Sequence, residues 1–370
     1  MLTFPLGVIF ASSLFKYRSS ESKIYSSTEV LKREGDARLE PAFLICLLAS
    51  IGFVGLYISE VETIPVLYAI LHPGSYHELA VLREESFKLL DSNFTYIYFW
   101  LKMMIFPILA AFSYGMYSIY KRKRWLVYFA VTLLIGTFYI SLSLERAPVA
   151  MFYLILFLFI FLLQRGRFKK RHLILALIAI AWFPILAIFL LTGLEFSAGT
   201  LFTVVSGVLH RFFYDKAYGL YQYFMIFPAH HGFLYGLGIR PLAFLTGQEY
   251  FNIPNYVFRL LNPTKIESGS ANTVFLGYYY ADFGMLGVLL SSFVAGVLLQ
   301  SLQIYFVRRR KDLLNFVVYV YLIFACWHLC STSITILLWS HGVIIVLLFP
   351  WLMKLLGELF SPRKAISSSG

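Results

Sequence analysis

The fold is decided by the contrast between hydrophobic spans and one polar segment, 194–271, whose densest part reads His210-Arg211-Phe212-Phe213-Tyr214-Asp215-Lys216-Ala217-Tyr218. Helical spacing would place its polar residues on two adjoining faces. One face carries Arg211, Asp215, Tyr218 and Gln222, and the other carries His210, Tyr214 and Tyr221. A polar stripe on an otherwise apolar helix is typical of a helix at a membrane surface. We therefore expect amphipathic helices in this segment.

The composition indicates a polytopic integral membrane protein. The chain has 370 residues, of which 59% are apolar and 14% are charged, and its mean hydropathy is +0.75. A soluble chain of this length could not cover so much apolar surface. We therefore predict an all-α bundle in a single integral membrane domain, 1–370. The net charge of +12 would suit nucleic acid, but its distribution argues against that partner.

The hydrophobic runs are close to the length of about 20 residues that a bilayer requires. We expect about nine spans, at 1–15, 41–59, 97–120, 125–143, 147–163, 172–193, 273–306, 313–332 and 334–353. The first span is short, which fits either a re-entrant half-span or a natural start upstream of Met1. The three cysteines fall within spans and are expected to be packing residues.

The basic residues predict the orientation. Five segments on one predicted side hold 22 of the 31 Lys and Arg: 16–40, 121–124, 164–172, 307–312 and the tail after 353. The positive-inside rule makes that side cytoplasmic. The long loop 194–271 and a smaller loop 60–96 would then face outward from the inner (cytoplasmic) membrane. The cytoplasmic segments are short and contain no phosphate-binding GxxxxGK[ST] loop, so ATP-driven transport by this chain alone is not expected.

Five arginines lie in the predicted external segments: Arg83, Arg146, Arg211, Arg240 and Arg259. A guanidinium group binds phosphate or carboxylate through two parallel hydrogen bonds. Arg146 follows Glu145 in a tight turn between two spans, so it would lie near the lipid headgroups. It would hold a lipid phosphate there, or snorkel, or pair with Glu145. For Arg211 the alternative to a catalytic role is a helix salt bridge with Asp215.

Candidate bases, ligands and aromatic platforms come from the same segments. His210 or Asp215 is the candidate general base, and a surface histidine is the alternative. Glu60 and Glu62 only loosely match a metal motif, so we expect neither a metal nor another cofactor. The loop tyrosines, Tyr214 and Tyr218 among them, would stack on sugars or lie at the membrane–water interface.

His328 and His341 fall within spans, where an ionisable group indicates a function or a helix–helix hydrogen bond.

One stretch supports a resemblance to a family. It reads Ser270-Ala271-Asn272-Thr273-Val274-Phe275-Leu276-Gly277-Tyr278-Tyr279-Tyr280-Ala281-Asp282-Phe283-Gly284-Met285-Leu286-Gly287. Together with the Ser143-Leu144-Glu145-Arg146 turn and the span plan, it resembles the Wzy-type O-antigen and exopolysaccharide repeat-unit polymerases. Asp282 would be neutralised by Arg211, Arg240 or Arg259 across the loop. Gly277, Gly284 and Gly287 would allow close helix packing or a broken helix start.

The resemblance implies polymerisation of oligosaccharide repeats carried on polyprenyl pyrophosphate, at the external face of the membrane. Arg146 and Arg211 would stabilise the leaving pyrophosphate. The candidate substrate-binding residues are Arg83, Arg240, Arg259, Tyr214, Tyr218, Asn272, Tyr280 and Asp282. Membrane lipid, a flippase and a chain-length regulator are the expected partners. The alternatives are a flippase or transporter of lipid-linked sugars, a membrane acyltransferase using His328 or His341, and a metal-dependent sugar transferase.

Overall fold

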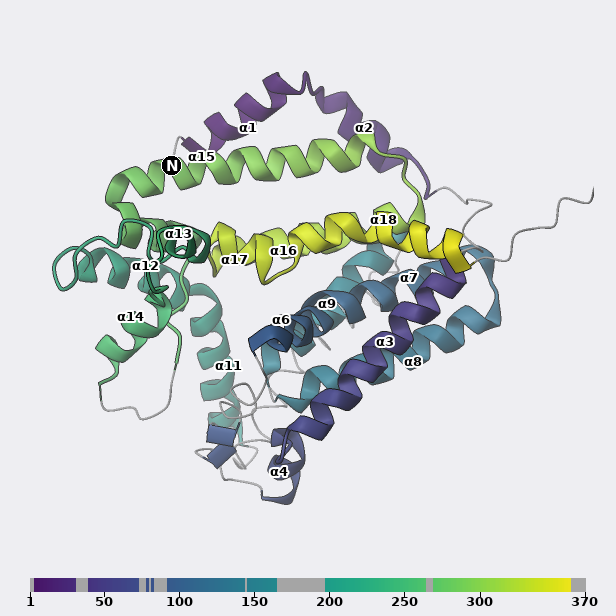
Figure 1. Ribbon diagram of the computed structural model, residues 1–370, viewed down its shortest axis with the longest axis horizontal. Coiled ribbons are helices and arrows are strands. Elements are labelled where there is room, and N and C mark those ends of the chain that lie inside the picture. Colours follow the sequence, from purple (N-terminus) through teal and green to yellow (C-terminus); the bar gives the residue numbers. More distant parts are fainter. Residues whose placement is uncertain are drawn as a thin grey trace, which may run out of the picture.

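The computed structural model describes residues 3–30, 39–72, 78–79, 81–82, 92–143, 145–164, 197–263 and 269–360. These residues form an all-α protein without a strand (Figure 1). The helices before residue 197 are α1 (Thr3–Leu14), α2 (Ser19–Ser27), α3 (Leu39–Glu60), α4 (Pro65–Leu71), α6 (Ser92–Trp100), the π-helix η2 (Leu101–Ile105), α7 (Phe106–Tyr120), α8 (Lys123–Leu142) and α9 (Arg146–Leu163). The later helices are α11 (Ala198–Phe213), α12 (Asp215–Ile226), α13 (Arg240–Leu245), α14 (Ile253–Leu261), α15 (Phe275–Arg308), α16 (Leu313–Trp327), the short 3₁₀ helix η3 (His328–Cys330), α17 (Ile334–Trp339) and α18 (Val343–Phe360).

Among the described residues, six helices are long and apolar enough to cross a membrane. They cover Leu39–Glu60, Thr95–Tyr120, Lys123–Leu142, Phe275–Arg308, Leu313–Cys330 and Ile334–Phe360. Each coincides with one of the spans expected from the sequence. The helices Thr3–Leu14 and Ala147–Leu163 are apolar but shorter, and the predicted span 172–193 lies outside the described residues. The chain is therefore compatible with a membrane protein, and the count of nine spans stays a prediction.

The longest helix, α15, is kinked near its start. Gly284 has φ 61° and ψ −147°, a conformation that is accessible to glycine and strained for other residues. The kink brings the preceding turn back onto Gly287, where a Cβ atom would overlap the carbonyl oxygen of Tyr279. The broken helix start that the spaced glycines predicted is therefore confirmed at Gly284.

Glycines also bring α1 and α15 into backbone contact. The two helices run side by side in Figure 1. A Cβ atom on Gly7 would overlap the carbonyl oxygen of Phe293, and one on Gly296 would overlap that of Phe4. Small residues that allow such close approach are a common basis of helix packing in membranes. Although α1 is too short to count as a span, it is therefore a tightly packed part of the bundle.

The close approach predicts a large response to a single added methyl group. Gly296→Ala is expected to destabilise the protein by about 1–3 kcal/mol, because α1 must move away from α15. Thermal unfolding of the detergent-solubilised protein measures the effect. Gly52→Ala in α3 is the matched control, because a Cβ atom there meets nothing within 4 Å. Equal melting temperatures for the two variants would show that α1 does not pack on α15 as described.

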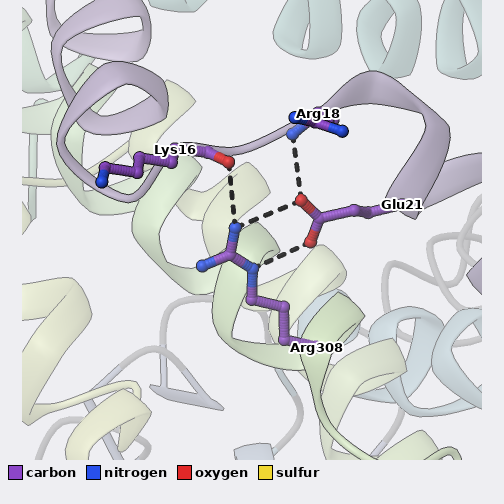
Figure 2. A network of polar contacts seen from close by, with 4 residues as sticks. All are labelled: Lys16, Arg18, Glu21 and Arg308. Atoms are coloured by element: carbon purple, nitrogen blue, oxygen red, sulfur yellow. Dashed lines mark hydrogen bonds and ion pairs between the residues drawn. The ribbon is translucent and has the colours of Figure 1, made fainter.

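A polar network fixes the other end of this helix pair. Figure 2 shows Arg308, in the last turn of α15, reaching the carboxylate of Glu21 in α2 and the carbonyl oxygen of Lys16. The Arg308 Nε to Glu21 Oε2 distance is 2.8 Å. Hydrogen bonds from the Arg308 side chain and the Arg18 backbone hold the pKa of Glu21 below its usual range. The network joins two of the basic segments, 16–40 and 307–312.

Further ion pairs gather the basic segments at the same end of the bundle. Arg124 lies 2.8 Å from Glu40, and Lys354 lies 3.7 Å from Asp312. Figure 1 accordingly places α2, the turn between α7 and α8 and the end of α18 at one side, and α11 to α14 at the other. The described parts of four of the five segments expected to face the cytoplasm thus lie together, far from the segment 197–274.

Candidate functional site

The segment 197–274 folds as a helical layer over the helix ends that lie opposite the basic end. Its own small core joins α12, α14 and the first turns of α15 through Tyr223, Ile226, Phe227, Leu234, Ile253, Val257 and Ala281. Tyr223 also donates a hydrogen bond of 3.0 Å to the carbonyl oxygen of Ala271. The described residues of this segment thus form a folded cap, which can hold side chains in fixed positions at this end of the bundle.

Asp282 anchors the cap to α15. Its carboxylate is fully buried, and Oδ1 accepts hydrogen bonds from the backbone N–H groups of Gly236 (3.1 Å) and Gly238 (3.0 Å). The Tyr235 N–H donates to the carbonyl oxygen of Asp282 at 2.9 Å. Within the described residues two backbone amides, and no arginine, bind this carboxylate, and its Oδ2 has no hydrogen-bond partner. Neutralisation by Arg211 stays a prediction, because that side chain lies outside the described residues. Asp282 thus fixes the loop that leads into α13, and its carboxylate is shielded from solvent.

Arg240 begins α13, directly after this anchored loop. Its guanidinium donates a hydrogen bond to the hydroxyl of Tyr96 in α6 and lies 4.8 Å from the ring centroid of Tyr250. Burial raises the pKa of Tyr250, and the neighbouring guanidinium opposes that shift. The Arg240 residue is nevertheless exposed. A fixed, accessible cation of this kind is well placed to bind an anionic group.

Further along α6, aromatic and imidazole rings fill the junction with the broken C-terminal helices. Trp100 donates from Nε1 to the carbonyl oxygen of Trp339 at 3.1 Å. The rings of His328 and His341 stack with centroids 4.1 Å apart and an interplanar angle of 17°. Among the described residues, Nδ1 of His341 has no hydrogen-bond partner. These two histidines of the candidate spans therefore contact each other by stacking.

Lys102 is a buried, paired charge that the sequence analysis missed. It lies in η2, a π-helical turn of the kind that often marks functional sites. Its side chain is 6% exposed, forms an ion pair with Glu145 and donates to Ser143 Oγ at 2.6 Å. A single lysine within the span Thr95–Tyr120 was the available signal, because intramembrane charges are rare and paired.

This ion pair changes the interpretation of Arg146. The Glu145 carboxylate, which was one possible partner of Arg146, pairs with Lys102. Arg146 is the first residue of α9, so its backbone is fixed directly after the ion pair. The side chains of Arg146 and Arg211 lie outside the part of the chain that the structure describes. What is shown is that Lys102 orients the turn in which Arg146 stands.

A small cavity separates Lys102 from His328. Both residues line it, together with Pro148, Tyr321 and mostly apolar side chains. Its volume of about 10 Å³ is close to the smallest space that holds one water molecule. The buried Lys102 centre therefore has no room for a sugar or a phosphate, whereas Arg240 is an accessible cation on the cap.

The corner between α11 and α12 presents a row of aromatic rings. The rings of His210 and Tyr214 are 4.4 Å apart, those of Tyr214 and Tyr218 are 5.4 Å apart, and those of Tyr218 and Tyr221 are 6.4 Å apart. All three tyrosines are exposed. Tyr218 thus stacks with Tyr214 and Tyr221, at spacings of four and three residues that share a helix face, and it adjoins both faces expected from the sequence. Helical spacing holds through Tyr214, whose N–H donates to the His210 carbonyl oxygen at 2.8 Å and whose carbonyl oxygen accepts from the Tyr218 N–H at 2.9 Å.

His210 and Asp215 meet across this corner. His210 Nδ1 lies 3.1 Å from Asp215 Oδ1. A carboxylate on one ring nitrogen orients the imidazole and leaves the other nitrogen to take up a proton. The structure therefore brings together the two residues that the sequence offered as alternative bases. They form one candidate acid–base pair.

The remaining predicted residues have separate places. Asn272 Oδ1 accepts hydrogen bonds from Ser270 (2.7 Å) and Tyr278 (3.2 Å), and Tyr280 stacks on Phe224 at 3.9 Å. These contacts shape the junction of the cap with α15. Arg259 is exposed near the end of α14, and Arg83 lies outside the described residues.

No metal site is found within the described ranges, where no group of three or more His, Cys, Asp or Glu side chains is placed to hold an ion. Glu60 accepts a long hydrogen bond of 3.5 Å from Tyr98.

Comparison with known proteins gives no match to a family model, to a curated protein or to a solved structure.

Proposed function

We propose that the protein is a membrane glycosyltransferase that polymerises oligosaccharide repeats carried on polyprenyl pyrophosphate. The observation that carries the proposal is the exposed guanidinium of Arg240, fixed by Tyr96 and Tyr250 at the ends of apolar helices. The lipid tail of such a substrate needs an apolar environment, and its diphosphate needs a fixed cation directly beside that environment. The proposal places the protein in the inner membrane, with the cap on its external face.

The exposed tyrosine row is the proposed sugar platform. Aromatic faces present a flat apolar surface with a polar edge, which suits the apolar face of a sugar ring. The rings of Tyr214, Tyr218 and Tyr221 follow one another along the helix, and the ring of His210 contacts that of Tyr214. Their mutual stacking reduces the entropy cost of ordering them when a glycan binds. The row therefore supports a chain-like ligand of several sugars.

In the proposed reaction, a hydroxyl of the acceptor repeat attacks the anomeric carbon of the donor glycan. The new carbon–oxygen bond forms as the bond to the pyrophosphate oxygen breaks. His210, oriented by Asp215, takes the hydroxyl proton. Negative charge develops on the leaving polyprenyl pyrophosphate, and Arg240 stabilises it together with the proposed catalytic guanidiniums of Arg146 and Arg211.

The test is to incubate the purified protein with a short lipid-linked repeat and to separate the products by size. A ladder of products with two, three and more repeats is expected. A flippase would instead move the lipid across vesicles without joining repeats, and an acyltransferase would transfer label from an acyl donor. Absence of a ladder from folded protein supplied with several chemically different repeats would exclude polymerisation.

A further inference from the structure

The short helix α13 exposes an unusual amount of apolar surface. Phe244 is 84% exposed and Leu245 is 77% exposed, whereas only Ala243 of this helix is buried. Between Arg240 and Glu249 the chain carries no charged side chain. Contiguous apolar surface of this kind on a folded unit indicates contact with a partner or with a membrane.

The surroundings of α13 indicate which partner covers this surface. Both Leu242 of α13 and Phe283 of α15 lie against Gly236, within 3.2 and 3.4 Å of the position of a Cβ atom. Past its kink, α15 exposes Met285, Leu286, Leu289, Leu290 and Val294. Because α15 is one of the six candidate membrane-crossing helices, this band is the surface that would face lipid. Through the shared contact at Gly236, α13 adjoins the first turns of α15, which lead into this band.

We propose that α13 is a wedge that inserts into the lipid leaflet at this end of the bundle. Phe244 and Leu245 would enter the acyl-chain region, and Arg240 at the start of the helix would lie at the level of the lipid phosphates. Apolar helices with a cation at one end adopt this arrangement because the charge remains in the headgroup layer. The hydrogen bonds of Asp282 to Gly236 and Gly238 hold the wedge at a fixed depth.

A fluorescent label at Phe244 tests the insertion. In a variant whose three cysteines are replaced by alanine, Phe244→Cys is labelled with the environment-sensitive dye NBD, and the protein is placed in phosphatidylcholine vesicles. Emission at short wavelength and quenching by nitroxide on the lipid acyl chains are expected. Leu289→Cys in the exposed band of α15 serves as the lipid-facing reference. Glu249→Cys, exposed and charged in the wild type, serves as the aqueous reference.

The outcomes are distinguishable. Quenching of the Phe244→Cys label by aqueous iodide to the same degree as Glu249→Cys would overturn the proposal. Protection from both quenchers that is lost when the protein is diluted in lipid would show that a second copy covers the surface, which also overturns it. Leu245→Cys repeats the measurement if the first variant does not fold. Because no substrate is present, the result is independent of the proposed enzymatic function.

Discussion

Replacing Lys102 by Met is expected to destabilise the protein by about 3 kcal/mol, because removing one partner of a buried ion pair leaves the other charge uncompensated. Lys102 is 6% exposed and Glu145 is 33% exposed, which places the expected cost at the low end of the range for buried pairs. The same change also leaves Ser143 without its donor. The fall in melting temperature of the detergent-solubilised protein measures the effect.

The double variant Lys102→Met with Glu145→Gln separates charge from packing. Because it removes both charges, it is expected to recover most of the lost stability. Lys123→Met, at an exposed position at the start of α8, is the control and is expected to be neutral. If the double variant is as unstable as Lys102→Met alone, the cost comes from the lost lysine stem and not from an unpaired carboxylate. The ion pair would then not be what holds the turn before Arg146.

The helices were predictable because their signal is local. An apolar run of sufficient length forms a helix whatever its neighbours are, since no other structure satisfies the backbone within lipid. The six candidate spans therefore begin and end near the residues expected from the sequence. The kink of α15 was also predictable from the sequence, because position 284 is a glycine and glycine adopts φ 61° without strain.

The site was less predictable because its contacts join distant parts of the chain. The partners of Asp282 are backbone amides some 44 and 46 residues away, and an amide carries no sequence signal. Likewise, Arg240 reaches Tyr96 across 144 residues. By contrast, the stacking of Tyr214, Tyr218 and Tyr221 follows from their spacing of four and three residues on a helix. Lys102 was visible as a charge within a span, but its partner Glu145 was considered only as one possible partner of Arg146.

Replacing Arg240 by Ala is expected to slow polymerisation by about 10²–10³-fold, the usual loss when one group that stabilises developing negative charge is removed. Arg240→Lys is expected to retain part of the activity, because the charge remains while the planar fork that binds two phosphate oxygens is lost. The alanine variant also loses the hydrogen bond to the Tyr96 hydroxyl and the contact with the Tyr250 ring, which position the guanidinium. Initial rates with a lipid-linked repeat, compared at saturating substrate, measure the loss.

Arg309→Ala is the matched control for this prediction. Its guanidinium also lies over a tyrosine ring, 4.4 Å from the centroid of Tyr305, but it follows the end of α15 among the basic segments. A general effect of losing an arginine–aromatic contact would appear in both variants, whereas an effect on the reaction appears only in Arg240→Ala. Stability must be measured alongside, because the guanidinium also bridges the cap to α6 through Tyr96. Unchanged rates for a folded Arg240→Ala protein would leave the diphosphate without its proposed cation, and the reaction would have to be assigned to Arg146 and Arg211 alone.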